Sequence, residues 1–284
     1  MKYGVHQLLF SETLSRKQLW ILDRVRKLGF DGIELTLFDP DSLPIPEIKK
    51  RAKALGLRLN TGIGLSEKHN LISPDQKTRQ RGVAFMNKLV EVSQQLGAEN
   101  LAGVNYAGWG YLTGKMRTEK EWGWAVESFR KICRFAKANT DVLLCIEPVN
   151  RFESHFINIA ADAVRFLKDV GEKNARVHLD TFHMIREEDN FAAAVKTCGS
   201  RLGYVHACEN QRGIPGTGLV PWEEFYRALK RVGYDGWITI ESFDPDLESI
   251  AKLCCIWRKL ADSPEELASR GLKFLKQVQR KTRA

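Results

Sequence analysis

Short apolar runs alternate with longer amphipathic segments along almost the whole chain. The apolar runs are rich in Val, Ile and Leu, which is typical of buried strands, whereas segments such as 16–29 and 81–97 repeat their apolar residues at helical spacing. Eight strands are predicted in this way, over residues 3–9, 31–37, 57–65, 100–106, 143–149, 176–182, 202–209 and 236–242. Strands that alternate with helices favour a parallel sheet.

The number of strand–helix units predicts a particular α/β fold. Eight units in 284 residues suit a (β/α)8 TIM barrel, which typically takes ~250 residues. LGFDGIEL (28–35) and VGYDGWITIE (232–241) form a weak internal repeat, in which a helix-ending Gly precedes an aromatic residue, Asp-Gly and a strand. An open doubly wound sheet is the alternative, but no GxGxxG turn follows the first strand. We expect a single domain over residues 1–284, with a C-terminal helical extension at about 245–284.

Composition and charge limit the class of protein. Hydrophobic residues make up 43% of the chain, which is enough for a large core, and no segment approaches the ~20 apolar residues that cross a bilayer. Six cysteines without CxxC spacing suggest reduced thiols, so we expect a cytoplasmic protein with no membrane partner. The net charge of +9 would suit a nucleic-acid partner, but much of it lies in the last segment, KFLKQVQRKTRA. We interpret that segment as a basic, solvated helix.

Carboxylate or imidazole side chains stand at the ends of the last four predicted strands. They are Glu147, Asp180, His206 and Glu241. The active site of a (β/α)8 barrel lies at the C-terminal ends of its strands, so these four side chains should converge there. Three carboxylates brought together without a cation would repel one another. A ligand set of carboxylate oxygens and one imidazole nitrogen favours Mn²⁺, Mg²⁺ or Co²⁺, and it can also bind Zn²⁺.

Two histidines flank Asp180 in the stretch VHLDTFHM (177–184). We expect His183 to stand above Asp180 in the following loop and to face the pocket. His178 shares the strand face of Asp180 one layer deeper. We interpret His178 as a hydrogen-bonded interior residue rather than a ligand.

Four segments together resemble the D-tagatose/D-allulose (D-psicose) 3-epimerases, a family of ketose 3-epimerases with the xylose-isomerase-like TIM barrel fold. The segments are CIEPVNRFE (145–153), HLDTFHM (178–184), VHACENQRGIPGTG (205–218) and ITIESF (238–243). The resemblance runs through nearly the whole chain. It implies a metal-dependent isomerase that interconverts free ketohexoses by moving a proton at C3 through an enediolate. The pairs would be D-fructose with D-allulose, D-tagatose with D-sorbose and L-ribulose with L-xylulose.

The resemblance also implies roles for individual residues. One divalent ion per chain, Mn²⁺ or Co²⁺ with Mg²⁺ as a further option, would be held by Glu147, Asp180, His206 and Glu241. Glu147 and Glu241 would also be the catalytic acid/base pair. The oxygens around C1 to C3 of the open-chain ketose would be bound by Glu153, His183 and Arg212.

The other end of the sugar is less well defined by the resemblance. His6 and Trp109 would face C4 to C6, and Phe243 would also contact the substrate. Many members of the family have an aromatic residue where His6 stands. Trp109 falls in a variable loop after the fourth strand. The resemblance therefore leaves the preferred ketose open.

Other functions fit the sequence less well. LDTFH resembles the LDTCH stretch of endonuclease IV DNA-repair enzymes, but those enzymes need a three-metal cluster, and this chain has only six His and lacks a DxHE pattern after strand seven. We therefore expect no nucleic-acid partner. Other sugar isomerases of the superfamily share the metal scheme and are closer alternatives. A non-catalytic sugar-binding barrel is disfavoured because both proton-transfer carboxylates are present.

The resemblance implies a homo-oligomer, either a dimer or a tetramer. A late helix around Ile256, Trp257 and Leu260 is predicted to carry more apolar surface than one barrel needs to cover. We therefore expect this region to contribute to subunit contacts.

Overall fold

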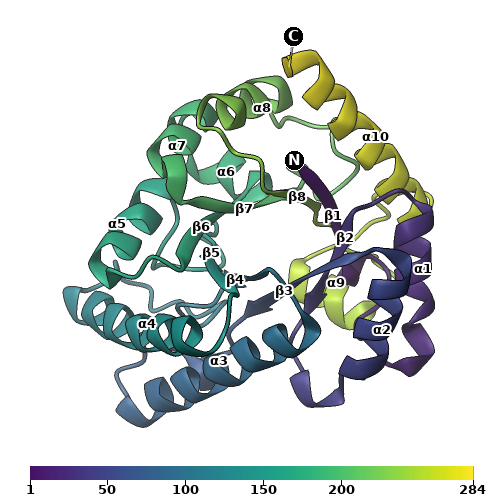
Figure 1. Cartoon of the computed structure of the whole chain (residues 1–284). Coiled ribbons are helices and arrows are strands. Elements are labelled where there is room, and N and C mark those ends of the chain that lie inside the picture. The colour runs from purple at the N-terminus through teal and green to yellow at the C-terminus, as the bar shows by residue number, and fades with distance from the viewer. Residues whose placement is uncertain (284) are drawn as a thin grey trace.

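Eight parallel strands close into a barrel in the computed structural model, which describes residues 1–283 (Figure 1). Each strand pairs with the next one in sequence, and β8 pairs with β1. The strands are β1 Lys2–His6, β2 Gly32–Thr36, β3 Arg58–Gly64, β4 Asn100–Val104, β5 Leu143–Ile146, β6 Ala175–Asp180, β7 Leu202–Ala207 and β8 Trp237–Ile240. The predicted (β/α)8 barrel is confirmed.

All eight predicted strands form, but several end earlier than the apolar pattern indicated. The prediction for the first strand ran to residue 9, whereas β1 ends at His6 and Gln7–Leu9 form a short 3-10 turn. Both leucines are buried: Leu8 packs with Phe243 and Ile250, and Leu9 belongs to the main core. Apolar residues thus continue to pack after the ladder hydrogen bonds have stopped, which is why the pattern overestimates strand length.

A ring of helices covers the outside of the barrel, whereas α9 (Glu248–Cys254) lies inside this ring (Figure 1). The helices are α1 Trp20–Lys27, α2 Ile45–Leu55, α3 Gln76–Leu96, α4 Glu119–Asn139, α5 Ala160–Val170, α6 Thr181–Glu187, α7 Phe191–Cys198, α8 Trp222–Arg231, α9 Glu248–Cys254 and α10 Pro264–Arg283. The predicted C-terminal extension is helical as α9 and α10. α10 closes the ring between α8 and α1, where Glu265 pairs with Arg24 and the Phe274 ring contacts Trp222. Within residues 1–283, each helix is too short or too polar to cross a membrane.

Side chains at helix ends help to set these boundaries. Asp75 accepts the backbone N–H groups of Lys77 (3.1 Å) and Thr78 (3.0 Å) at the start of α3. Thr118 and Glu121 form a capping box at the start of α4. α3 ends at Leu96 and is followed by the C-cap residue Gly97, whose φ of 75° is left-handed and therefore suits glycine.

The barrel interior is apolar at one end and polar at the other. Ala102, Cys145, Tyr204 and Trp237 form a separate buried cluster inside the strands. Trp237 opens β8, and a Cβ at Gly32 would lie 2.6 Å from its ring. The bulky ring therefore fills the N-terminal end of the barrel, and the space for a site lies at the opposite, C-terminal end.

The segment between α9 and α10 differs from the prediction. Ile256, Trp257 and Leu260 do not lie on a helix, because α9 ends at Cys254 and α10 begins at Pro264. Cys255 adopts a left-handed φ of 56° and ends α9 without a glycine. Ile256 and Leu260 pack into a small core with Phe243, whereas Trp257 is 73% exposed.

Candidate active site

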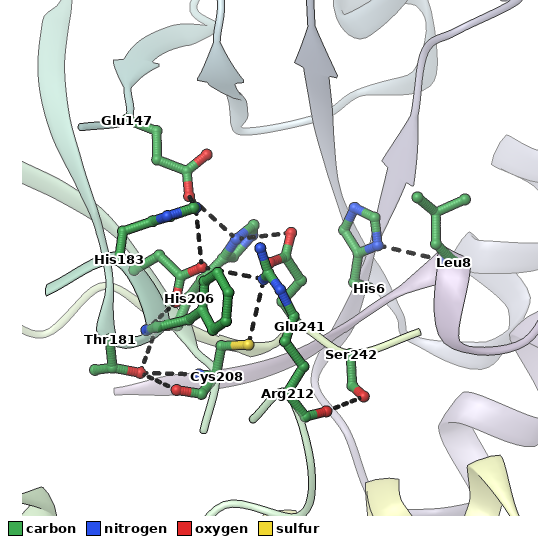
Figure 2. Close-up of polar contacts among 12 residues, drawn as sticks. His6, Leu8, Glu147, Thr181, His183, His206, Cys208, Arg212, Glu241 and Ser242 are labelled. Atoms are coloured by element: carbon green, nitrogen blue, oxygen red, sulfur yellow. Dashed lines mark hydrogen bonds and ion pairs between the residues drawn. The ribbon is translucent and has the colours of Figure 1, made fainter. Parts of the chain in front are cut away.

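Four ligand-type side chains meet at the C-terminal mouth of the barrel. Asp180 ends β6, His206 lies in β7, and Glu147 and Glu241 directly follow β5 and β8. The Nδ1 atom of His206 lies 3.3 Å from an oxygen of Glu241 and 3.9 Å from an oxygen of Glu147. Figure 2 shows Glu147, His206 and Glu241 gathered around one small space. The structure thus brings together the four side chains that the sequence singled out.

Asp180 combines a structural contact with a place in the site. One carboxylate oxygen accepts the backbone N–H of Phe182 (2.8 Å) and caps α6. The other oxygen lies 3.4 Å from Nη1 of Arg212 and 3.8 Å from Nε2 of His183. A carboxylate at a strand end often serves only as a helix cap. In Asp180 the capping bond also fixes the second carboxylate oxygen, which faces Arg212 and His183.

The electrostatics of this cluster favour a bound cation. Burial, together with Glu241 and other nearby carboxylates, raises the pKa of Glu147 well above its usual value and raises that of Asp180 to about 8. Burial would also raise the pKa of Glu241, but Arg212 and His206 hold it well below its usual value. Nδ1 of His206 is buried and faces the carboxylates of Glu241 and Glu147, but it forms no well-aligned hydrogen bond within residues 1–283. Crowded carboxylates around one imidazole nitrogen form a donor set that fits a divalent metal ion.

His183 lies in the first part of α6 and not in a loop, so the prediction of its backbone was wrong. The helix begins at once after Asp180, since that residue is its cap. His183 nevertheless faces the site, with Nε2 3.8 Å from both Glu147 and Asp180. Nδ1 accepts the backbone N–H of Asn150 (3.0 Å), and burial lowers the pKa of His183 to about 4. The neutral ring therefore carries its proton on Nε2 and can donate it to a ligand.

His178 differs from its prediction in one respect. It is a fully buried interior residue, as expected, but neither ring nitrogen has a hydrogen-bond partner in the described part of the chain. Nδ1 lies 3.6 Å from an oxygen of Glu147, and the ring packs edge-on against His206 with centroids 4.1 Å apart. Burial keeps the pKa of His178 well below its usual value. A neutral His178 thus forms the floor under Glu147 and His206.

Arg212 is held in the site by a strained loop. Its φ of 63° is left-handed, which is uncommon for a residue other than glycine and is often found at functional sites. The guanidinium contacts Glu241 and stacks on the ring of Phe182 at 3.7 Å, with Phe243 at 5.0 Å. The hydroxyl of Ser242 donates to the Arg212 carbonyl oxygen (2.5 Å; Figure 2). The positively charged guanidinium of Arg212 therefore points toward the carboxylates of the site.

Glu153 is fixed by two neighbours at the edge of the site. Its carboxylate accepts the indole N–H of Trp109 (2.7 Å) and the side-chain amide of Asn150 (2.9 Å), and it lies 4.0 Å from Nη2 of Arg212. The indole N–H of Trp109 is thus already used, so Trp109 offers the pocket a ring face. These bonds join the loops after β4 and β5.

One pocket at the mouth of the barrel connects these groups. Nine of the ten residues singled out from the sequence line it, and Asp180 lies just behind them; the nine are His6, Trp109, Glu147, Glu153, His183, His206, Arg212, Glu241 and Phe243. Leu253 and Cys254 of α9 also line the pocket, so the C-terminal extension forms part of its wall. Nε2 of His6 lies 3.3 Å from the Thr36 hydroxyl.

Three buried polar residues that organise the site were not predicted from the sequence. Asn150 contacts both His183 and Glu153. Glu209 accepts the backbone N–H groups of Gly216 (2.8 Å) and Val220 (3.0 Å) in the loop that carries Arg212.

The third residue is Glu34, whose carboxylate lies 2.7 Å from Nε2 of His206. The internal repeat contained a signal for Glu34, because its Asp-Gly motif leads to a strand acid in both copies.

Comparison with known proteins places this geometry in a family. The xylose isomerase-like TIM barrel family matches residues 22–278. The chain is 35% identical to the L-ribulose 3-epimerase of Mesorhizobium japonicum, over 96% of this chain and 93% of that protein. It is 36% identical to the D-psicose 3-epimerase of Agrobacterium fabrum, over 92% and 91% of the two chains.

A solved structure agrees with these relatives. The D-allulose 3-epimerase of Methylomonas sp. in complex with D-allulose superposes with a TM-score of 0.93 at 32% identity, covering 98% of this chain and 96% of that one. The chain therefore belongs to the ketose 3-epimerases of the xylose isomerase-like TIM barrel family.

Proposed function

We propose that the protein is a metal-dependent ketose 3-epimerase acting on free ketohexoses, with D-allulose, D-fructose, D-tagatose and L-ribulose as candidate substrates. One observation carries the proposal: Glu147 and Glu241 follow different strands, β5 and β8, and an oxygen of each carboxylate lies within 3.9 Å of Nδ1 of His206. Inversion at C3 needs one group to remove a proton and another to return it on the opposite face. The names of the relatives support the same reaction.

Glu147, Asp180, His206 and Glu241 are the proposed ligands of one divalent metal ion per chain. The crowded carboxylates and the His206 nitrogen that faces them without a well-aligned hydrogen bond support this set. Three carboxylates and one imidazole suit Mn²⁺ or Co²⁺, with Mg²⁺ as a further option. When bound, such an ion would act as a Lewis acid toward the oxygens next to C3 and lower the cost of negative charge there.

The remaining steps belong to side chains of this protein. One of the two glutamates removes the C3 proton, and the other delivers a proton to the opposite face of the enediolate. Arg212 and the Nε2–H of His183 stabilise the negative charge that develops on the substrate oxygens. Glu153, held by Trp109 and Asn150, accepts a substrate hydroxyl near C1 to C3. The C4 to C6 end lies against His6, Trp109 and Phe243.

The direct test is a set of sugar incubations. Metal-loaded protein is mixed separately with D-fructose, D-tagatose, D-allulose and L-ribulose, and the products are separated by chromatography. We expect the C3 epimer of at least one of these ketoses. Aldose products, or no conversion of any ketose with Mn²⁺ or Co²⁺ present, would refute the proposal and favour another sugar isomerase of the superfamily.

We also propose that the protein is a homodimer or homotetramer in the cytoplasm. Six free cysteines in the described residues are consistent with a reducing compartment. Trp257 is 73% exposed, and Leu253, which lines the pocket, is 47% exposed; apolar side chains left open to solvent in this way support a subunit contact.

Light scattering at micromolar concentration should therefore give at least twice the chain mass of 32.4 kDa. Replacing Trp257 by Ser should weaken the assembly, whereas replacing the exposed Trp20 on α1 should leave it unchanged. A monomer in the wild-type protein would contradict this expectation.

A further inference from the structure

Glu34 is held in one orientation inside the barrel. It lies on β2 and is 1% exposed. One carboxylate oxygen accepts the Tyr204 hydroxyl (2.8 Å) and lies 2.7 Å from Nε2 of His206. The neighbouring strand leaves room for the other oxygen because it has Gly62, where a Cβ would lie 2.3 Å from that atom. The carboxylate therefore has little freedom to turn away from His206.

His206 uses opposite edges of its ring for two different groups. Nε2 faces Glu34 on the inner side, whereas Nδ1 faces Glu241 and Glu147. A contact of 2.7 Å between a ring nitrogen and a carboxylate oxygen requires a proton between them, so Nε2 carries it. The edge-on packing of His178 restricts rotation of the ring. With Nε2 protonated, the Nδ1 lone pair is available on the side of the carboxylate cluster.

We infer that Glu34 is a positioning residue of the metal centre, which fixes the tautomer and orientation of His206 so that Nδ1 meets the cation. The inference rests on the proposed function, in which His206 is a ligand. Glu34 is not a ligand itself, because the imidazole ring separates it from Nδ1. Carboxylate partners of metal-bound histidines also raise the basicity of the ring, and their loss typically weakens metal binding by about 10–100-fold.

Glu34→Gln tests this role, because the amide keeps the size of the side chain and removes its charge. We expect the Mn²⁺ dissociation constant, measured from the paramagnetic resonance signal of free Mn²⁺, to rise by about 10–100-fold. Tyr204→Phe removes one donor that holds Glu34 and should shift the constant in the same direction by less. It also keeps the test informative if Glu34→Gln does not fold.

Thr61→Val is the matched control for general loss of stability. Thr61 is buried on β3, and its hydroxyl contacts Ser93 (2.7 Å) and the Asn100 carbonyl oxygen (2.8 Å) rather than the site. This variant should melt at a lower temperature but bind Mn²⁺ like the wild type. The inference is overturned if Glu34→Gln binds as tightly as the wild type, or if Thr61→Val weakens binding equally. A wild type that binds no Mn²⁺ would overturn the proposed metal centre together with the inference.

Discussion

Replacing Glu241 by Gln should lower the turnover number by about 10²–10⁴-fold, the range typical for loss of a positioned acid or base. The same result is expected for Glu147→Gln. The amide keeps the size of the side chain and one oxygen that can still face a metal, so the protein should fold and bind Mn²⁺ more weakly. The measurement is the initial rate of epimer formation at saturating ketose, with metal occupancy determined in parallel.

A matched control separates the catalytic effect from a change in charge. Glu223 lies on the exposed side of α8 and pairs with Arg227 and Lys281, so Glu223→Gln removes one negative charge far from the pocket. This variant should keep the wild-type rate. A Glu241→Gln protein that is fully loaded with metal and retains most of its turnover would rule out Glu241 as the acid or base.

Removal of the metal should abolish activity entirely, and Mn²⁺ or Co²⁺ should restore it. Without a cation, the site contains three crowded carboxylates, and the charge that develops on the substrate has lost its strongest partner. Binding should also raise the melting temperature, because an ion that binds only the folded chain stabilises it by about 2.7 kcal/mol at a concentration of 100 times its dissociation constant. Calorimetric melting of chelator-treated and reloaded protein measures this effect.

The affinity for Mn²⁺ should rise with pH. Burial and the nearby Glu241 raise the pKa of Asp180 to about 8, so the metal-free site holds a proton at neutral pH that must leave when the cation binds. Raising the pH from about 6 to about 8 lowers the protonated fraction of Asp180 from nearly all to about half, which weakens this competition. Calorimetric titrations of Mn²⁺ into metal-free protein, repeated in buffers with different ionisation enthalpies, should show that binding releases protons. Full activity in metal-free protein would contradict the claim that catalysis depends on a metal ion bound at this site.

The fold was readable from the sequence because its signals are local and repeated. Each apolar run followed by a helical segment indicates one strand–helix unit. Eight such units can pack compactly in only a few arrangements, and the closed barrel is one of them. The strand-end position of Asp180 or Glu241 follows from the same pattern. In a parallel barrel the C-terminal ends of all strands face the same mouth, so the convergence of these side chains could be predicted without knowledge of distant contacts.

Contacts across the barrel could not be predicted in this way. Glu34 and His206 lie on β2 and β7, which are not neighbours, and no periodicity reports that their side chains meet. The missing partner of His178 depends on ring packing in the interior. The end of α9 was missed because Cys255 takes a left-handed conformation that usually signals glycine.

Epimerisation in D₂O tests the central claim most directly, because proton exchange at C3 is what the pair Glu147 and Glu241 is proposed to perform. Mass spectrometry and NMR of the product locate any deuterium taken from the solvent. Wild-type protein should place deuterium at C3 of the epimer, and a variant with one working glutamate should exchange C3 of the starting ketose without forming the epimer. Epimer that carries no solvent deuterium at C3 under any condition would contradict proton transfer by two carboxyl groups whose protons exchange with the solvent.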